Sequence, residues 1–467
     1  MDLDLMLVST PLKSDDTHHG LCPSLSTLTL GSYLARQGAS VRVFDPSVEV
    51  ETAGVSSSAI LDAIARRCVE EQPRFLGLSA LSPIEGKFGA ALARRVKALD
   101  PTLPVVMGGL WASTYKAQVM SHLPEVDAVI EGPGELPAAR LLSTSRGRVP
   151  VWSEVPGLTW RGGSNPPSGH YTAQLSVPLD FSLLRHPERY DIMVYLSSRG
   201  CPFRCSFCSE PLVFPDYVDE PIEKVRADVA AFVAVGKPYY FWICDPIFGF
   251  SPRRVDEICE LFEPTPFECL IESRVDVLKP EMVAQVARAG CRLIYFGLES
   301  GAYNSLRMLD KVRDRDHFDR YRENTRALVE ACAQHGVLPM FGVMNPVPGD
   351  TPADLSECLD FLKELVAMSS AIRPDLALHL LPLRCRMDMG SPMQVRFQDF
   401  AARGVTRACG EEDLFDDMFL VRASPTVGPD EGDAFRDAVR ALWTPTPKAL
   451  ATLALSFPRP YLEVEWK

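Results

Sequence analysis

Short apolar, β-branched runs alternate with stretches of helical spacing through the first third of the chain. The expected strands are residues 5–8, 40–44, 74–79, 104–107 and 128–130, and the expected helices are 25–37, 57–71, 86–99 and 136–142. Strands that alternate with helices are typical of a doubly wound parallel sheet. Ligands of such sheets bind beyond the carboxyl ends of the strands, so the loops after the strands are the expected binding positions.

A second series of strands and helices follows a stretch rich in Gly, Pro and Ser over about 143–178. Its expected strands are 192–197, 239–244, 268–273, 293–297, 338–344 and 376–381, and its expected helices are 222–235, 252–261, 279–289, 316–335 and 352–368. Six strands with helices between them predict a partial parallel barrel with its chemistry at the C-terminal rim. After about Arg384 the regularity fades into an acidic segment.

The expected fold class is therefore α/β, in two domains. We predict a doubly wound, Rossmann-like domain over 1–145, a linker over 146–185, a partial (β/α)6 TIM barrel over 186–385 and a small C-terminal extension over 386–467 that covers the substrate.

Charge and composition narrow the functional classes. The 467 residues include 48 Lys and Arg against 61 Asp and Glu, a net charge of −13, which argues against a nucleic-acid binder because phosphates require a basic footprint. The N-terminal residues lack the pattern of a signal peptide, and no run approaches the roughly 18 apolar residues of a membrane helix. We expect a cytoplasmic protein whose 13 cysteines are reduced and which has no membrane partner.

Cys201, Cys205 and Cys208 form a CxxxCxxC run directly after the first expected barrel strand. Iron–sulfur clusters normally take four cysteines, so a compact set of three leaves one iron open to another ligand. An open coordination position is the mark of a catalytic metal. The alternatives are a zinc loop, although no His follows closely as a fourth ligand, or three unrelated buried cysteines.

With this motif, residues from about 190 to 385 resemble a radical S-adenosylmethionine (SAM) enzyme. The resemblance implies a [4Fe-4S] cluster held by the three cysteines, SAM chelated at the open iron, reductive cleavage of SAM to a 5′-deoxyadenosyl radical, and an electron donor such as flavodoxin or ferredoxin. The SAM-binding residues that it implies are Phe207, Asp245, Arg274, Glu299, Ser300 and Asn345. Taken singly, a charged residue at a strand end is as readily a helix cap or a rim salt bridge, and Pro246 stands where the family commonly has a second acidic residue.

The N-terminal region resembles the cobalamin-binding domain that precedes many radical SAM enzymes. The matching motifs are 30–36, 77–80, 108–111 and 131–135, whose small residues permit close backbone approach to a corrin. The cobalamin-binding residues implied are Thr10, Ser79, Ala80, Gly108, Gly109, Leu110, Glu131, Gly132, Gly134 and Glu135. The alternative is a retained domain that binds no corrin. His18 and His19 nearly match the axial-ligand motif of cobalamin mutases, but we expect an exposed loop there and no His under the cobalt.

Together these resemblances imply a cobalamin-dependent radical SAM enzyme. The function we expect is a methyltransferase acting on an unactivated carbon of a small metabolite or natural-product intermediate. The alternative is a non-methylating rearrangement, cyclisation or dehydration, with or without cobalamin. A degenerate sensor would have lost a cluster ligand, and an electron carrier would use four cysteines. Arg384 and Arg386, in the segment after the last strand, are candidate substrate contacts, and the mixed charges there suggest a polar substrate.

Overall fold

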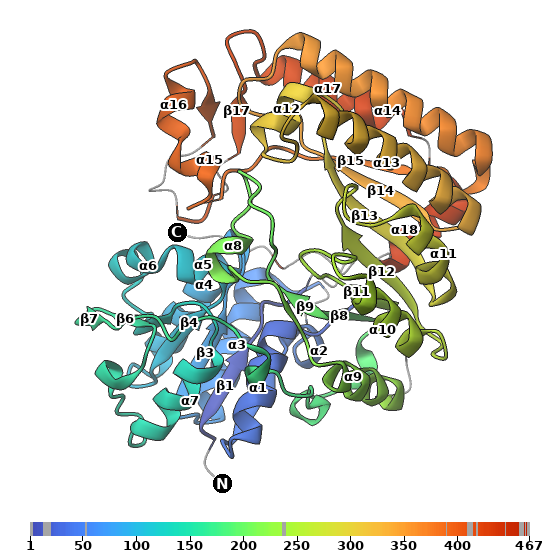
Figure 1. The fold of residues 1–467 in the computed structure, drawn as a ribbon. Coiled ribbons are helices and arrows are strands. Elements are labelled where there is room, and N and C mark those ends of the chain that lie inside the picture. Colours follow the sequence, from blue (N-terminus) through green and yellow to red (C-terminus); the bar gives the residue numbers. More distant parts are fainter. Residues whose placement is uncertain are drawn as a thin grey trace.

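The computed structural model describes residues 3–12, 20–51, 54–235, 240–388, 390–408, 414–416, 419–443, 445–456, 462 and 464. Two parallel sheets with their helices follow one another along the chain, and the curved second sheet turns its open side toward the N-terminal domain (Figure 1). This arrangement confirms the predicted fold class, a doubly wound domain followed by a partial barrel. His18 and His19 lie outside the described residues.

The N-terminal sheet has seven strands in the order β2-β1-β3-β4-β5-β6-β7. The five parallel strands are β1 (Leu5–Val8), β2 (Val41–Phe44), β3 (Phe75–Ser79), β4 (Val105–Gly108) and β5 (Ala128–Ile130). The two antiparallel strands at the edge are β6 (Leu158–Trp160) and β7 (Gly163–Ser164).

Helices cover both faces of this sheet, as its alternating pattern requires. They are α1 (Leu25–Arg36), α2 (Pro46–Glu49), α3 (Ser57–Glu70), α4 (Pro83–Leu99), α5 (Leu110–Thr114), α6 (Lys116–His122) and α7 (Glu135–Thr144). In β1, Leu5 and Leu7 point into one hydrophobic core, and Met6 and Val8 point into another on the opposite face. Successive strand residues point to opposite faces, so a strand buried on both sides reads as a continuous apolar run.

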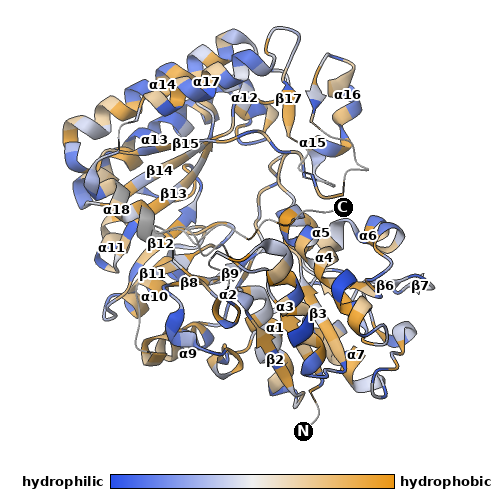
Figure 2. Ribbon diagram, turned by 180° about the vertical axis from the view of Figure 1, so that it is seen from behind, coloured by the Kyte–Doolittle hydropathy of each residue, from blue (hydrophilic) through white to orange (hydrophobic). Residues whose placement is uncertain are grey.

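The barrel sheet has six parallel strands in the order β8-β11-β12-β13-β14-β15. They are β8 (Ile192–Tyr195), β11 (Tyr240–Ile243), β12 (Glu268–Ser273), β13 (Cys291–Glu299), β14 (Leu338–Val343) and β15 (His379–Pro382). Two short antiparallel pairs lie outside this sheet: β9 (Ser198–Arg199) with β10 (Val218–Asp219), and β16 (Thr406–Arg407) with β17 (Leu420–Arg422). In Figure 2 the strands of both sheets are predominantly hydrophobic.

The barrel and the segment after it contain the remaining helices. They are α8 (Glu210–Val213), α9 (Ile222–Val235), α10 (Pro252–Phe262), α11 (Pro280–Arg288), α12 (Tyr303–Met308), α13 (Arg315–His335), α14 (Pro352–Ile372), α15 (Pro392–Val395), α16 (Phe397–Ala401), α17 (Pro429–Ala441) and α18 (Pro447–Ser456). Single 3-10 turns are η1 (Trp152–Glu154), η2 (Ala173–Leu175), η3 (Phe181–Leu183), η4 (Pro187–Arg189) and η5 (Pro374–Leu376). None of the helices described is long and apolar enough to cross a membrane.

Local signals explain where the long barrel helices begin and end. Thr351 caps α14 in a reciprocal capping box with Asp354, and Pro352 occupies the first turn. Gly336 ends α13 with φ of 70°, a left-handed conformation that costs glycine little.

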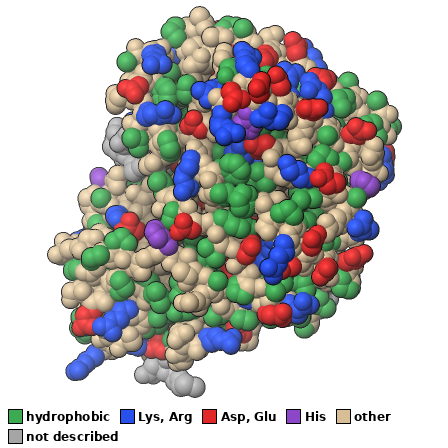
Figure 3. Space-filling view, viewed as in Figure 1, with side chains coloured by type: hydrophobic (Ala, Val, Ile, Leu, Met, Phe, Trp, Pro, Cys, Tyr) green, Lys and Arg blue, Asp and Glu red, His purple; other side chains and the backbone are tan. Residues whose placement is uncertain are grey.

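On the face drawn in Figure 3, basic and acidic side chains are intermingled around hydrophobic ones.

The bottom of the barrel is closed by apolar packing. Ile192, Tyr240, Leu270 and Leu293, from the first halves of four strands, form one core with Ala449 of α18. The chemistry is therefore left to the opposite, C-terminal end of the strands.

The two domains are joined by a continuous core and by buried polar contacts. One hydrophobic cluster extends from Leu5 and Leu7 of the first sheet to the helices around the barrel. The hydroxyl of Tyr190 donates to Asp45 Oδ2 at 2.8 Å, and Asp180 N donates to Ser32 Oγ at 2.8 Å. These contacts fix how the barrel sits on the N-terminal domain.

The structure departs from the sequence prediction in two segments. Residues 158–164, predicted as part of a linker, form the β6–β7 hairpin that extends the first sheet, because a Gly-rich turn connects two strands there. The region after Arg384, predicted as irregular, contains α17 and α18, and α18 lies at the bottom of the barrel rather than over its mouth. Asp388 and Met393 do lie at the mouth, where Met393 N donates to Ser206 O at 2.7 Å and Ser209 Oγ donates to Asp388 at 3.2 Å.

Candidate active site

The three cysteines lie on the loop that follows β8 and β9. Cys205 is buried, whereas Cys201 and Cys208 are partly exposed. Burial raises the pKa of Cys208 to about 12 and also raises that of Cys201. Because metals bind the thiolate form of cysteine, binding of metal by this loop must release protons from the thiols. Within the described ranges, no three His, Cys, Asp or Glu side chains are grouped as ligands of one metal ion.

The start of the cysteine loop depends on Gly200. Its φ is 71°, and a Cβ at this position would overlap the carbonyl oxygen of Asp216. The loop therefore needs a residue without a side chain immediately before Cys201.

Ser206 fastens the middle of the loop to the barrel rim. Its N–H donates to Leu309 O at 3.1 Å, and its hydroxyl donates to Met308 O at 2.8 Å. The two neighbours of Ser206, Cys205 and Phe207, are thereby held at the mouth of the barrel.

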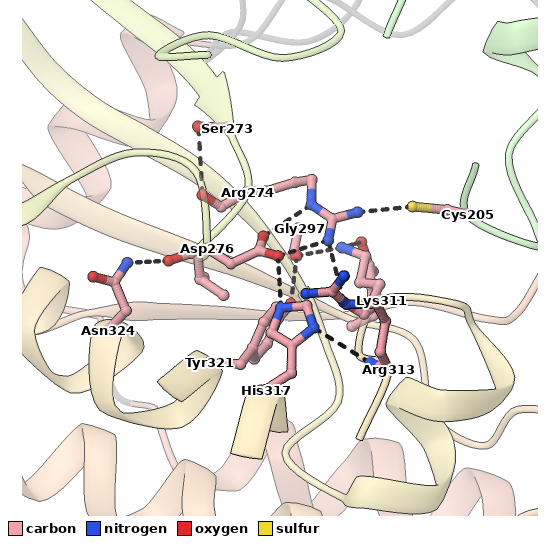
Figure 4. A network of polar contacts seen from close by, with 12 residues as sticks. Cys205, Ser273, Arg274, Asp276, Gly297, Lys311, Arg313, His317, Tyr321 and Asn324 are labelled. Atoms are coloured by element: carbon pink, nitrogen blue, oxygen red, sulfur yellow. Dashed lines mark hydrogen bonds and ion pairs between the residues drawn. The ribbon is translucent and has the colours of Figure 1, made fainter. Parts of the chain in front are cut away.

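Arg274, directly after β12, reaches the cysteine loop (Figure 4). Its Nη1 donates to Cys205 Sγ at 3.0 Å, while Nε and Nη2 each donate to Asp276 at 2.9 Å. The ring of Phe203 lies 4.0 Å from the guanidinium carbon. The guanidinium thus places a charged hydrogen-bond donor against the Cys205 sulfur.

Asp276 holds this guanidinium in place. Burial alone would raise the pKa of Asp276, but the hydrogen bonds and charge of Arg274 hold it below its usual range. His317 Nε2 lies 3.5 Å from Asp276 Oδ2 on the other side (Figure 4). The carboxylate is therefore ionised and orients Arg274 toward Cys205.

Glu299 ends β13 in an unusual backbone conformation. Its φ is 65°, in the left-handed region, which is energetically unfavourable for a residue that has a Cβ. Lys311 Nζ lies 2.9 Å from Glu299 Oε1 and also donates to Gly297 O. Both side chains of this ion pair are buried, and Lys311 O accepts from Arg274 Nη2 at 3.4 Å. Lys311 thus links the predicted residues Arg274 and Glu299.

Phe207 and Ser300 differ in how they relate to the ion pair of Glu299 and Lys311. Lys311 Nζ lies 6.0 Å from the centre of the Phe207 ring, so Phe207 belongs to the same group at the mouth. Ser300 is fully buried, and its Oγ accepts from Ala302 N at 3.0 Å. Ser300 therefore shapes the turn after β13.

Asn345 follows β14 and is fully buried. Its Nδ2 donates to Ser305 Oγ at 3.0 Å and to Asp350 Oδ2 at 2.7 Å, whereas its Oδ1 has no hydrogen-bond partner in the described structure. Burial raises the pKa of Asp350 to about 6. A buried amide oxygen without a donor is costly, so Asn345 Oδ1 offers an acceptor to a ligand.

Asp245 uses its carboxylate within the chain, and its contact with SAM stays a prediction. Oδ1 accepts from the backbone N–H groups of Ser197 and Ser198, at 2.5 and 3.1 Å, and Oδ2 accepts from their hydroxyls, at 2.6 and 2.9 Å. These four bonds occupy the acceptor capacity of a carboxylate. Asp245 instead fixes the strand end from which the cysteine loop departs.

A cavity of about 650 Å³ lies between the two domains, at the carboxyl ends of the strands of both sheets. The N-terminal domain contributes Leu7, Thr10 and Gly109, among others, and the barrel contributes Val194 and Trp242, among others. No histidine is among the described residues that line the cavity. That cobalt would bind here without a His ligand stays a prediction.

Most of the predicted cobalamin-binding residues line this cavity. They are Thr10, Ser79, Gly108, Gly109, Leu110, Gly132, Gly134 and Glu135. Ala80 and Glu131 do not: Ala80 is fully buried behind the wall, and Glu131 forms an ion pair with Lys116.

The N-terminal wall of the cavity fits a bulky ligand that needs close backbone approach. Gly109 has φ of 103°, and a Cβ there would meet Ala80 O at 2.5 Å. Thr10 is buried, and its Oγ1 has no hydrogen-bond partner in the part of the chain that the structure describes. The wall thus combines glycine loops with an unpaired hydroxyl, as the amide edge of a corrin requires.

Arg384 and Arg386 lie apart from this cavity. Both are exposed; Arg386 Nε lies 2.8 Å from Asp388 Oδ1, and Arg384 Nη2 lies 3.8 Å from Asp433. Arg386 is linked to the residue after Cys208 through Asp388, which accepts from Ser209 Oγ at 3.2 Å, and Arg384 makes no such link among the described residues.

Sequence reasoning missed Asp276, Lys311 and three side chains inside the barrel, Trp242, Glu272 and Tyr295. Trp242 Nε1 donates to Glu272 Oε1 at 2.7 Å. A polar residue at an inward position of an otherwise apolar strand was the available signal for Glu272. Lys311 lies in a loop and carries no motif.

Two protein families match successive parts of the chain. Residues 16–142 match the B12 binding domain, and residues 195–362 match the radical SAM superfamily. The first match spans the loops after β3, β4 and β5, and the second begins at the end of β8 and includes all three cysteines.

Among curated relatives, an uncharacterized methyltransferase of Pyrococcus horikoshii is 23% identical over 358 residues, which cover 73% of each chain. The anaerobic magnesium-protoporphyrin IX monomethyl ester cyclase of Rubrivivax gelatinosus is 26% identical over 271 residues, covering 54% of this chain and 48% of the cyclase. The hopanoid C-3 methylase of Methylococcus capsulatus is 28% identical over 222 residues, 45% of this chain and 42% of the methylase. This chain therefore matches less than half of the length of the last two.

A solved structure shares the whole architecture. The radical SAM methyltransferase TsrM from Kitasatospora setae superposes with a TM-score of 0.74 at 17% identity, covering 98% of this chain and 96% of TsrM, which shows a common fold. The two family domains imply a [4Fe-4S] cluster, SAM and cobalamin as cofactors. With a B12-binding domain followed by a radical SAM domain, the chain is a cobalamin-dependent radical SAM enzyme.

Proposed function

We propose that this enzyme transfers a methyl group from cobalamin to an unactivated carbon of a small molecule. The observation that carries the proposal is the 650 Å³ cavity, which is lined by both domains at the carboxyl ends of their strands. Gly109 stands on its cobalamin side and Trp242 on its barrel side. A substrate in this space would face both cofactor-binding domains.

The bound groups supply two kinds of chemistry: reductive cleavage of SAM, which activates a C–H bond, and methyl transfer from cobalt. The chain's part begins with Cys201, Cys205 and Cys208, which would hold the cluster. Arg274 donates to Cys205 Sγ and so stabilises the anionic ligand. Asp276 keeps that guanidinium in position.

We assign the binding of SAM to the residues grouped at the mouth. Phe207, Lys311 and Glu299 lie together there, and Asn345 offers its unpaired Oδ1 to a donor such as an amino or hydroxyl group. Asp245 and Ser300 act through the backbone turns that they hold.

Thr10, Gly108, Gly109, Gly132 and Gly134 would hold cobalamin. They follow β1, β4 and β5 and line the same wall of the cavity. Apolar side chains such as Leu7 and Leu30 line it as well and exclude water from the reacting groups.

The relatives support methyl transfer and also a second candidate function. Two of the three described are methyltransferases by name, and one is a cyclase. The cyclase favours, as the second candidate, a radical reaction at the same site without methyl transfer. For either reaction we propose a flavodoxin or ferredoxin as electron donor and a small molecule as substrate.

Anaerobic reconstitution with iron, sulfide and hydroxocobalamin, followed by measurement of iron and cobalt per chain, tests the proposal. The loaded enzyme is then supplied with a reduced flavodoxin or ferredoxin, with SAM carrying a trideuteromethyl group and with pooled small metabolites. We expect near-stoichiometric cobalt, formation of 5′-deoxyadenosine and S-adenosylhomocysteine together, and label in one product detected by mass spectrometry.

Each alternative gives a different result. Iron without cobalt, or 5′-deoxyadenosine without S-adenosylhomocysteine or labelled product, would contradict methyl transfer and favour the second candidate. A chain in which all three cysteines are replaced by Ala is the control, since it should retain cobalt and lose cleavage of SAM.

A further inference from the structure

Three polar side chains lie on the inner surface of the barrel, above its apolar bottom. Trp242 comes from β11, Glu272 from β12 and Tyr295 from β13, and Glu272 and Tyr295 are paired in register on neighbouring strands. Trp242 and Tyr295 pack on the core of Leu270 and Leu293 beneath them. Polar groups in such a setting are costly unless they find partners.

Glu272 lacks a counterion. Its Oε1 accepts from Trp242 Nε1 at 2.7 Å, and among the described residues its carboxylate has no other hydrogen bond and no ion pair. Burial, together with the like charge of Asp245, raises the pKa of Glu272 to about 7. A buried carboxylate with a single neutral donor is poorly compensated and would gain from a cation.

Tyr295, the register partner of Glu272, presents a second unpaired group, with its hydroxyl over the neighbouring strand β14. A Cβ at residue 342 would overlap its hydroxyl, so Gly342 on β14 makes room for this oxygen. The part of the chain that the structure describes supplies no hydrogen-bond partner for the hydroxyl. Burial and the negative charges of Glu299 and Glu272 raise the pKa of Tyr295. A carboxylate from β12 and a hydroxyl from β13 thus belong to the same stretch of the barrel sheet, with the hydroxyl over β14.

This polar group adjoins the cavity between the domains. Trp242, which binds Glu272, is itself part of the cavity wall with Val194 and Cys244. The side chain of Glu272 is partly exposed, and it contacts Trp242, which lines the cavity. A substrate in the cavity can therefore direct a polar end toward Glu272.

We infer that Glu272 is a specificity residue that binds a basic nitrogen of the substrate, with Tyr295 as a second hydrogen-bonding partner. An ammonium group supplies both the positive charge and the donors that the carboxylate lacks, whereas a neutral donor would leave the charge buried and unpaired. The inference rests on the proposed function for the placement of the substrate in the cavity.

Binding of two matched probes tests this inference without turnover. The full chain, loaded anaerobically with cluster and cobalamin, is titrated with para-fluorobenzylamine and with para-fluorobenzyl alcohol, and Kd is measured by fluorine NMR. We expect the amine to bind at least about tenfold more tightly than the alcohol, as for a hydrogen bond to a charged group. Glu272→Gln should abolish this preference while affinity for the alcohol stays unchanged.

Two further variants complete the design. Glu281→Gln changes an exposed carboxylate on α11 and should leave both Kd values unchanged. Glu272→Asp keeps the charge and should keep part of the preference. Circular dichroism verifies that each variant is folded.

Several outcomes would overturn the inference. They are equal binding of the amine to the wild-type chain and to a folded Glu272→Gln variant, an amine that binds the wild-type chain no more tightly than the alcohol, or no detectable binding of the amine. The comparison of the two probes on the wild-type chain decides even if Glu272→Gln does not fold. Selective amine binding by an enzyme that yields no methylated product would instead contradict the proposed function.

Discussion

Arg274 Nη1 donates to Cys205 Sγ at 3.0 Å, while Asp276 binds the other two nitrogens of the same guanidinium. The planar fork of arginine makes this possible, because it serves a sulfur and a carboxylate at once. Arg274, which directly follows the third barrel strand in chain order and is 69 positions away from Cys205, therefore places a positive charge beside the cysteine loop.

Arg274→Lys should leave a cluster that cleaves SAM about 10- to 100-fold more slowly, the usual cost of losing a residue that supports a metal ligand. Loss of a hydrogen bond to sulfur should also lower the reduction potential. A redox titration followed by EPR and an assay of 5′-deoxyadenosine measure these effects. Arg204→Lys is the matched control, because the exposed Arg204 binds only backbone carbonyls. An unchanged potential in Arg274→Lys would remove Arg274 from the cluster environment.

Replacing Cys201, Cys205 and Cys208 together by Ala should abolish the iron–sulfur absorbance and all cleavage of SAM. The thiolates are the proposed ligands, and Arg274 then has no sulfur to bind. Iron analysis and 5′-deoxyadenosine formation are the measurements. Cleavage that survives in this variant would show that the cluster lies elsewhere.

Glu299→Ala should weaken SAM binding by about tenfold while iron content stays normal. The change also leaves Lys311 buried without its carboxylate, which costs about 3–5 kcal/mol of stability. The double variant Glu299→Ala with Lys311→Met separates the two effects, because it should recover stability but not SAM affinity. Recovery of both would give Glu299 a purely structural role.

Gly109→Ala should eliminate cobalt binding and leave iron binding intact. The added Cβ would meet Ala80 O at 2.5 Å, and φ of 103° is unfavourable for alanine. Gly38→Ala is the matched comparison: its φ is 89° but the space around it is open and it lies away from the cavity, so only a backbone cost of roughly 1–3 kcal/mol is expected. Cobalt and iron per chain are measured in both variants, and normal cobalt in Gly109→Ala would contradict the assigned corrin wall.

The stability of the chain should depend on pH through Glu272. Its pKa is raised from 4.5 to about 7 on folding, so the folded state retains the proton longer than the unfolded state does. The stabilisation is fully present below pH 4.5 and is lost as pH rises through about 7, by no more than about 3 kcal/mol. Urea unfolding of the wild type and of Glu272→Gln across this range measures the difference. Parallel curves for the two proteins would show that Glu272 is not buried as described.

The sequence was sufficient for the parallel strands because strands such as β3 and β12 are apolar runs bounded by turns. The β6–β7 hairpin was missed because Gly162 and Gly163 sit in a Pro- and Gly-rich stretch typical of a linker, and short edge strands need little apolar surface.

The candidate site likewise contains residues that the sequence could predict and residues that it could not. The cysteines could be predicted because they are contiguous in sequence, and Arg274 because it ends a strand. Lys311 and Asp276 could not, since each is defined by a partner that only the fold brings near. Asp245 shows the converse limit: its position at a strand end was predicted, but its four hydrogen bonds to Ser197 and Ser198 were not visible in the sequence.

The core shared by the two domains also bears on how the enzyme exchanges its ligands. Swinging the domains apart would expose the apolar surface around Leu5, Leu7 and Tyr190 at a cost of about 25 cal/mol for each Å² and would break the bond from Tyr190 to Asp45. Hinged opening during each catalytic cycle is therefore disfavoured. Ligand exchange should instead occur while the two domains stay packed together, as the core that they share requires.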